Sequence, residues 1–303
     1  MRILLLGAEG QLGTSLRRSL GVLGELIALG RGGAPGLTGD LRQERGLRET
    51  IRTVRPDVLV NAAAYTDVDG AESSWDAAFV VNGHAPGVLA EELARTGGLL
   101  VHYSTEHVFD GSGTRGWRED DPVAPVNAYG RSKLIGEDRV RTSGGHHLIL
   151  RTSWVYAAHG RNFLRSMLRH GATRDRLEVV QDQRGSPTSA ELVADVTAHC
   201  LRQTVPEAGR AYCGTYHVTA RGGASRLEYV RELVGRARRV GLPLRVRPED
   251  VAGVGSDHFP APAERPRNST MCTTRIEETF GLRMPPWQRG VQEAIELLAD
   301  RAG

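Results

Sequence analysis

The stretch Ile3-Leu4-Leu5-Leu6-Gly7-Ala8-Glu9-Gly10-Gln11-Leu12-Gly13 decides the fold of this 303-residue chain. Its first four residues are all apolar, which is typical of a strand buried on both faces of a parallel sheet. Three glycines follow at once, and Leu12, Leu16 and Leu20 then recur at helical spacing. Strand, glycine-rich turn and helix in this order predict the start of a Rossmann-type fold.

Each glycine of such a turn has its own task. Gly7 permits the tight turn, Gly10 lets the backbone approach a pyrophosphate, and Gly13 lets the helix pack closely on the strand. The pyrophosphate would lie at the helix N-terminus, near Gln11 and Leu12, where free N–H groups and the helix dipole favour an anion. We therefore predict a dinucleotide site here, with a purely structural turn as the alternative.

The end of the second predicted strand, residues 26–29, indicates which dinucleotide is bound. A site that prefers NAD would place an acid there to hold the ribose 2′-hydroxyl, whereas this chain has Gly30-Arg31 and no acid until Asp40. Because Arg31 can neutralise a 2′-phosphate, we predict NADPH, with NADH possible. Asp40 and Leu41 could meet the adenine edge. The alternative is that Arg31 is an exposed loop residue.

Two further predicted strands end in small or hydroxyl-bearing residues. Residues 58–60 run into Asn61-Ala62-Ala63-Ala64-Tyr65, whose alanines allow close approach of the cofactor's ribose and phosphates. A helical stretch at 76–96 leads to residues 99–103, which are followed by Ser104 and Thr105. Strands that alternate with helices predict a parallel sheet with ligands at its carboxyl edge.

The chain has 39 basic residues, and Lys133 is the only lysine among them. It lies four residues after Tyr129, so both side chains project from one face of a predicted helix. A nearby ammonium favours the phenolate and would lower the pKa of Tyr129 toward the working range. The alternative is that Lys133 is a solvated helix residue.

Thr105, Tyr129 and Lys133 together predict a carbonyl-reduction site. The nicotinamide would deliver hydride to carbon, Tyr129 would deliver the proton to oxygen, and the Thr105 hydroxyl would polarise the C=O group. Lys133 would also hold the ribose hydroxyls of the nicotinamide nucleotide. The spacing of Tyr129 and Lys133 alone is a weak signal, but it follows a Rossmann start and a strand that ends in Ser-Thr.

At this point the chain resembles the extended short-chain dehydrogenases/reductases and, more narrowly, the dTDP-4-dehydrorhamnose reductase family. The resemblance covers almost the whole chain. It is carried by the glycine-rich and alanine-rich stretches above and by Val101-His102-Tyr103-Ser104-Thr105, Arg151-Thr152-Ser153-Trp154-Val155-Tyr156, Asp182-Gln183-Arg184-Gly185-Ser186-Pro187-Thr188 and Arg265-Pro266-Arg267-Asn268-Ser269.

The resemblance implies NADPH-dependent reduction of the 4-keto group of dTDP-6-deoxy-L-lyxo-4-hexulose to dTDP-L-rhamnose. It places Thr105, Tyr129 and Lys133 at the catalytic positions and Trp154 against the sugar nucleotide, with Ser104 also near the sugar. Arg265 could meet the diphosphate, because arginine binds phosphate in a forked geometry, or it could be a solvated loop residue.

Three departures from the family pattern stand out. His107 occupies a position where the family usually has a tyrosine near the sugar, so a related dTDP-4-keto-6-deoxy sugar is an alternative substrate. Ser15 occupies a position where some members carry an acid that helps to bind magnesium, so we predict no metal. Arg226 stands where the family often has tryptophan.

We expect an α/β protein with a Rossmann-type doubly wound parallel sheet at 1–150, to which later segments return, and a smaller C-terminal substrate-binding lobe mainly at 151–303. Residues 241–267 are expected to form loops, and residues 287–301 a closing helix. The net charge of +3 and the absence of a long apolar run predict neither a nucleic-acid nor a membrane partner. Three cysteines, an odd number without a CxxC pair, fit the cytoplasm, where a monomer or homodimer is expected.

Two functions of other classes stay open. One is a non-catalytic NADP-binding regulatory subunit, against which the complete set of Thr105, Tyr129 and Lys133 argues. The other is an epimerase or dehydratase on the same scaffold. A dehydratase would carry a second acid after Glu106, where this chain has His107. Fold alone does not decide between such chemistries.

Overall fold

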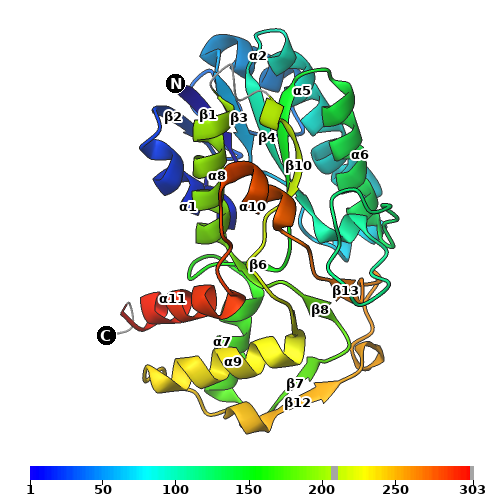
Figure 1. Ribbon diagram of the computed structural model, residues 1–303, viewed down its shortest axis with the longest axis vertical. Coiled ribbons are helices and arrows are strands. Elements are labelled where there is room, and N and C mark those ends of the chain that lie inside the picture. Colours follow the sequence, from blue (N-terminus) through cyan, green and yellow to red (C-terminus); the bar gives the residue numbers. More distant parts are fainter. Residues whose placement is uncertain (206–210, 301–303) are drawn as a thin grey trace.

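The computed structural model describes residues 1–205 and 211–300 and has two parts, one above the other in Figure 1. The upper part is a parallel sheet with helices on both faces, and the lower part is a smaller lobe of three long helices and short strands. No helix in the described ranges combines the length and the apolar character that crossing a bilayer would need.

The main sheet has six strands in the order β2-β1-β3-β4-β5-β10, and every neighbouring pair is parallel. Its strands are β1 (Arg2–Leu6), β2 (Glu25–Leu29), β3 (Val58–Asn61), β4 (Leu99–Thr105), β5 (His146–Thr152) and β10 (Gly214–His217). The chain moves to one side of β1 for β2 and to the other side for β3. This reversal creates a crevice at the carboxyl ends of β1 and β3, and it confirms the predicted doubly wound sheet.

Side chains alternate between two apolar layers along each strand. Ile3 and Leu5 face one layer, and Leu4 and Leu6 face the other. The first layer contains α1 (Gln11–Gly21), α8 (Ala190–Thr204) and α10 (Thr274–Phe280), and the second contains α2 (Glu44–Val54), α5 (Ala85–Ala94) and α6 (Ala128–Thr142). Because both faces are covered, residues 3–6 of β1 are all apolar and buried, as the sequence predicted.

The predicted helix at 76–96 is interrupted. It consists of α4 (Trp75–Ala78), a π-helical segment η1 (Phe79–His84) and α5. Pro86 lacks the N–H group that an α-helix would pair with the carbonyl of Asn82, which favours the wider turn. The Asn82 side chain accepts from the Tyr65 N–H group at 2.8 Å and donates to the Tyr65 carbonyl at 2.9 Å, so it fixes the loop after β3.

The smaller lobe packs α7 (Phe163–Thr173), α9 (Arg226–Arg239) and α11 (Trp287–Asp300) around its own apolar clusters. Three short sheets join it: β6 (Val155–Tyr156) with β9 (Thr188–Ser189), β8 (Arg184–Gly185) with β11 (Ala224–Ser225) and β13 (Asn268–Ser269), and β7 (Leu177–Val180) with β12 (Val251–Val254). The predicted closing helix is confirmed through Asp300, and residue 301 lies outside the described residues.

The stretch at 241–267 was expected to form loops only, and this is wrong in one place. The strand β12 lies within it and pairs in parallel with β7. Val251 is buried in the apolar cluster that underlies α9, which explains why a short β segment forms in a region rich in proline and glycine. The segments α8, β10 and α10 belong to the upper part, whereas the boundary at residue 150 stays a prediction.

A buried ion pair joins α6 to the sheet. Arg151 on β5 donates to both carboxylate oxygens of Glu137 on α6, at 2.8 Å and 2.7 Å, and both side chains are almost wholly buried. Burial alone would raise the pKa of Glu137, but the hydrogen bonds and charge of Arg151 hold it below its ordinary value. Arg141 adds a second cation to the same carboxylate.

We expect Glu137→Gln to lower the free energy of unfolding by about 3 to 5 kcal/mol, because it leaves the buried Arg151 without a counter-charge. Asp138→Asn is the matched control on the same helix. It removes an exposed carboxylate that pairs with Arg141, and should cost about 1 kcal/mol or less. Urea denaturation measures both. Equal losses in the two variants would show that the pair contributes little.

Candidate active site

The glycine-rich turn after β1 has the geometry of a phosphate site. Gly7 adopts φ +80°, and its N–H group donates to the Leu29 carbonyl at 2.9 Å, which ties the turn to the end of β2. A methyl group on Gly13 would lie 2.0 Å from the Gly7 carbonyl oxygen, so only glycine fits there. The helix α1 begins at Gln11 without a side-chain cap, which leaves its first N–H groups free for an anion.

The two residues after Gly10 have different surroundings. The Gln11 side chain donates to the Val155 carbonyl at 3.0 Å, and its own carbonyl oxygen is buried without a partner. Leu12 packs its side chain against the core of the sheet. Leu12 can therefore offer a ligand only its backbone, whereas Gln11 also has an unused polar atom at the crevice.

An acidic side chain lies at the end of β2, where the sequence predicted none. A methyl group on Gly30 would lie 2.4 Å from the Glu9 carboxylate, so this carboxylate of the glycine-rich turn lies against the strand end. Arg31 is exposed beside it. The sequence did not reveal Glu9 because the residue precedes the second strand by sixteen positions and reaches it only through the fold.

Asp40 and Leu41 are both buried. Arg42 donates to the Asp40 carboxylate at 2.6 Å and lowers its pKa, and the charge of Arg31 lowers it further. Leu41 belongs to the apolar layer that contains α2 and α5. Both residues therefore have structural partners, and of Arg31, Asp40 and Leu41 it is Arg31 that is exposed.

The alanine-rich loop after β3 lies against the glycine-rich turn, as predicted. A methyl group on Gly7 would lie 2.6 Å from the Ala63 nitrogen, and the Ala62 N–H group donates to the Leu6 carbonyl at 3.0 Å. Ala64 and Tyr65 continue this half-buried loop. Small side chains are thus needed where the two loops approach each other, and they keep the crevice open.

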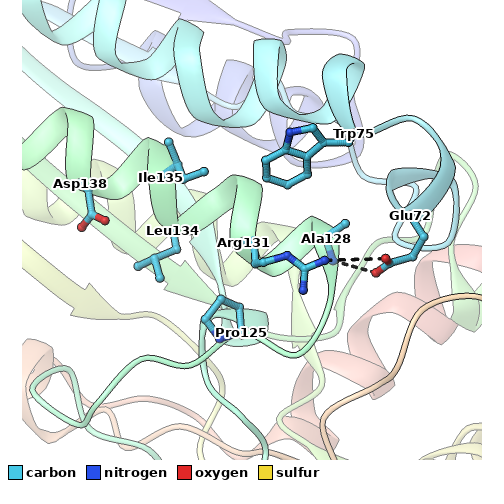
Figure 2. Close-up of a pocket in the computed structure, with 8 residues that line it drawn as sticks. All are labelled: Glu72, Trp75, Pro125, Ala128, Arg131, Leu134, Ile135 and Asp138. Atoms are coloured by element: carbon cyan, nitrogen blue, oxygen red, sulfur yellow. Dashed lines mark hydrogen bonds and ion pairs between the residues drawn. The ribbon is translucent and has the colours of Figure 1, made fainter.

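The first turn of α6 positions Tyr129. The Asn127 side chain accepts from the Gly130 N–H group at 2.8 Å, and the Glu72 carboxylate accepts from the Ala128 N–H group at 2.7 Å. Figure 2 shows Glu72 also facing Arg131 across the mouth of a cavity of about 490 Å³. Residues of α3 (Gly70–Ser73), α4 and α6 and Pro125 line this cavity, and Lys133 is not among them.

The structure contradicts the expected effect of Lys133 on Tyr129. The pKa of Tyr129 is raised above its ordinary value, mainly by burial and then by the charge of Glu106, while the Thr105 hydroxyl opposes this. The Lys133 ammonium donates to the Tyr103 carbonyl at 2.5 Å and lies 3.4 Å from His102 Nε2. It is therefore paired with β4, and burial lowers its own pKa to about 8.

Thr105 and Glu106 form a hydrogen-bonded pair next to Tyr129. The Thr105 hydroxyl donates to the Glu106 carboxylate at 2.8 Å. Burial raises the pKa of Glu106 to about 7, although Thr105, Arg226 and Ser153 oppose the shift. Ser104 is buried on the opposite face of β4, where its hydroxyl helps to lower the pKa of Glu137. The structure therefore does not bring Ser104 together with Thr105.

His107 is held as a neutral hydrogen-bond donor. Because the Asn127 oxygen accepts from Gly130, its amide nitrogen must be the atom 2.9 Å from His107 Nδ1, and so Nδ1 accepts and Nε2 carries the proton. Burial and the nearby cations Arg265 and Arg226 lower the pKa of His107 to about 4. Its ring also meets the Tyr129 ring edge-on at 5.4 Å.

Trp154 is held in an unusual conformation at the junction of the two parts. Its φ of +45° is rare for a bulky residue, and a methyl group on Gly185 would lie 2.3 Å from its indole ring. The guanidinium carbon of Arg226 lies 4.0 Å from the centroid of the Trp154 ring. Glycine at 185 is thus required to seat the indole, and Arg226 covers it.

Arg265 is engaged within the protein. It donates to the Asp69 carboxylate at 2.8 Å and to the Ala263 carbonyl at 2.9 Å. It still lies close enough to His107 and Arg226 for its charge to lower the pKa of each. Arg265, which the sequence predicted at the substrate site, therefore lies near His107 and Arg226. The sequence did not predict the effects of Glu106 and Arg226 on the reacting groups.

Three comparisons identify relatives of this chain. The family model described as RmlD substrate binding domain matches residues 1–299. A dTDP-4-dehydrorhamnose reductase of Burkholderia thailandensis is 45% identical over 96% of this chain and 97% of its own. The crystal structure of a dTDP-4-dehydrorhamnose reductase from Clostridium acetobutylicum has a TM-score of 0.89 at 32% identity and covers 98% of this chain and 99% of its own. One from Bacillus anthracis, in complex with NADP, has a TM-score of 0.86 at 30% identity and 98% and 99% coverage.

The raised pKa of Glu106 predicts how stability changes with pH. A carboxyl group with a pKa of about 7 in the folded protein and 4.5 when unfolded disfavours folding once it ionises. The stabilising contribution of the protonated Glu106 to the free energy of unfolding is therefore present below about pH 4.5. It is lost as the pH rises through about 7. In urea denaturation at a series of pH values, Glu106→Gln should not show this loss of stability. The exposed control Glu278→Gln should show it as the wild type does. Identical profiles for wild type and Glu106→Gln would contradict the assignment.

Proposed function

This chain belongs to the dTDP-4-dehydrorhamnose reductase family, and we therefore propose that it reduces the 4-keto group of dTDP-6-deoxy-L-lyxo-4-hexulose with NADPH to give dTDP-L-rhamnose. The observation that carries the proposal is the meeting of Thr105 and Tyr129 at the carboxyl edge of the sheet, beside the crevice of the glycine-rich turn. Lys133 lies one turn further along the same helix.

The residues at the crevice fit a dinucleotide. Gly7, Gly10 and Gly13 and the free N–H groups of α1 would hold the pyrophosphate, and the alanine-rich loop would lie along the ribose and phosphates. Arg31 would meet the 2′-phosphate of NADPH, and Glu9 beside it would accept from a 2′-hydroxyl, which leaves NADH possible. NADPH, when bound, supplies the hydride of the reaction.

The chain's own groups would handle the proton. Tyr129 would donate its phenolic proton to the carbonyl oxygen of the sugar, and the Thr105 hydroxyl would donate a hydrogen bond to the same oxygen. The Thr105 hydroxyl can do this only when its hydrogen is not bonded to the Glu106 carboxylate. Protonated Glu106 frees this hydrogen, because the carboxylic acid can itself donate a hydrogen bond to the Thr105 oxygen. Lys133 would hold the ribose hydroxyls of the nicotinamide nucleotide.

The smaller lobe would supply the sugar-nucleotide side of the site. Trp154 is fixed by Gly185 at the junction of the two parts, where it can lie against the substrate. His107 Nε2–H would donate to a sugar oxygen in place of the tyrosine usual in the family. A different donor at this point supports the second candidate, a reductase of a related dTDP-4-keto-6-deoxy sugar.

Other functions have less support. A non-catalytic NADP-binding regulatory subunit would not need Thr105 and Tyr129 in contact. An epimerase or dehydratase has less support because Glu106 is followed by a neutral histidine and not by a second acid. The cytoplasmic location and the monomeric or homodimeric state stay predictions.

The test is oxidation of NADPH by the purified protein with the dTDP-4-keto sugar, followed at the nicotinamide absorbance band. We expect turnover by the wild type, and a loss of about 100- to 10,000-fold in kcat for Lys133→Met and for Tyr129→Phe. Methionine is chosen because Lys133 is buried, and an unbranched apolar side chain of similar length should keep the packing.

Arg131→Met is the matched control, because Arg131 is an exposed residue of the same helix that lines the cavity of Figure 2, and the change should not affect turnover. Near-normal kcat in Lys133→Met would remove lysine from the proposed machinery. No NADPH oxidation by the wild type with either the usual or a related 4-keto sugar would overturn the proposed function itself.

A further inference from the structure

The guanidinium of Arg226 has no hydrogen-bond partner among the described residues. Arg226 begins α9, and its guanidinium carbon lies 4.0 Å from the ring centroid of Trp154 and 4.8 Å from that of Phe163. Within residues 1–205 and 211–300, no carboxylate, carbonyl or hydroxyl accepts from this side chain. Its backbone N–H group alone is used, in a bond of 3.2 Å to the Gln183 carbonyl.

The Arg226 side chain is half-buried, so its donors stay open to solvent and to a ligand. A guanidinium carries five N–H donors in a planar fork, which a ligand with several acceptor oxygens can use. Burial lowers the pKa of Arg226 to about 10, so the group is still charged at neutral pH. The aromatic faces of Trp154 and Phe163 hold its plane but leave its in-plane donors free.

The neighbouring charges do not satisfy these donors. Glu106 attracts Arg226, but the two do not form an ion pair, and the Glu106 carboxylate already accepts from Thr105. Arg265 adds a second positive charge nearby, while two of its own nitrogens are bound to Asp69 and Ala263. Arg265 therefore has fewer free donors than Arg226, whose side-chain donors are all unused among the described residues.

We propose that Arg226 binds the diphosphate of the sugar nucleotide, an inference that rests on the proposed function. The diphosphate is the only strong anion in that substrate, and the planar fork of a guanidinium matches its oxygens. Arg265 sets the positive potential of this subsite, and Trp154 holds the guanidinium in place. The phosphate contact expected of Arg265 stays a prediction beside that of Arg226.

Calorimetric titration of dTDP into the protein tests this subsite without any turnover. We expect Arg226→Met to weaken dTDP binding by at least about 10-fold, the effect of losing a charged hydrogen-bonding group. NADPH binding, which we expect at the glycine-rich turn, should be unchanged and also reports that the variant is folded. If Arg226→Met does not fold, Arg226→Gln carries the same expectation.

Arg239→Met is the matched control, since it removes one exposed positive charge from the far end of the same helix. It should bind dTDP as the wild type does. An Arg226 variant that binds NADPH normally, and binds dTDP within about 2-fold of the wild type, would overturn the inference. The proposed function would still stand if the wild-type protein reduces the sugar. A wild-type protein that binds dTDP through Arg226 but does not reduce the sugar would sink the proposed function alone.

Discussion

The buried pair of Glu137 and Arg151 is the constraint on which the rest of the site depends. It fixes α6 to β5, and β5 pairs with β4 in a register that sets Ser104 opposite Arg151 and Thr105 opposite Thr152. Tyr129 and Lys133 lie on the same helix, in the turns that precede Glu137. One charged contact therefore fixes the two groups on α6 relative to Thr105 at the end of β4. Removing either charge would leave the other buried and unpaired.

Burial at the site sets the protonation of each group near the reacting oxygen. Glu106 has its pKa raised to about 7, His107 is held neutral, and Arg226 keeps its charge although burial lowers its pKa to about 10. These shifts arise because the smaller lobe covers the carboxyl edge of the sheet, so that water is replaced by aromatic rings and fixed hydrogen bonds. The upper part thus provides the dinucleotide crevice, and the lobe provides the environment in which a hydroxyl, a phenol and an acid can share protons.

The sequence predicted the sheet, the glycine-rich turn and the contact of Thr105 with Tyr129, because these follow from local patterns and from the rule that parallel strands end at one edge. It did not predict Glu9 against Gly30, the bond from Lys133 to the Tyr103 carbonyl, or the lack of partners around Arg226. Each of these depends on segments that are distant in the sequence. The strand β12 was missed because its stability comes from pairing with β7 and burial of Val251, not from its own composition.

The most direct test of the central claim is the fate of the hydride in a reaction with NADPH deuterated at the transferable position. Proton magnetic resonance and mass spectrometry of the product would locate the label. We predict one deuterium at C4 of the sugar in dTDP-L-rhamnose or in a closely related dTDP-6-deoxyhexose. Unlabelled product, or oxidation of NADPH that does not depend on the 4-keto sugar, would contradict it.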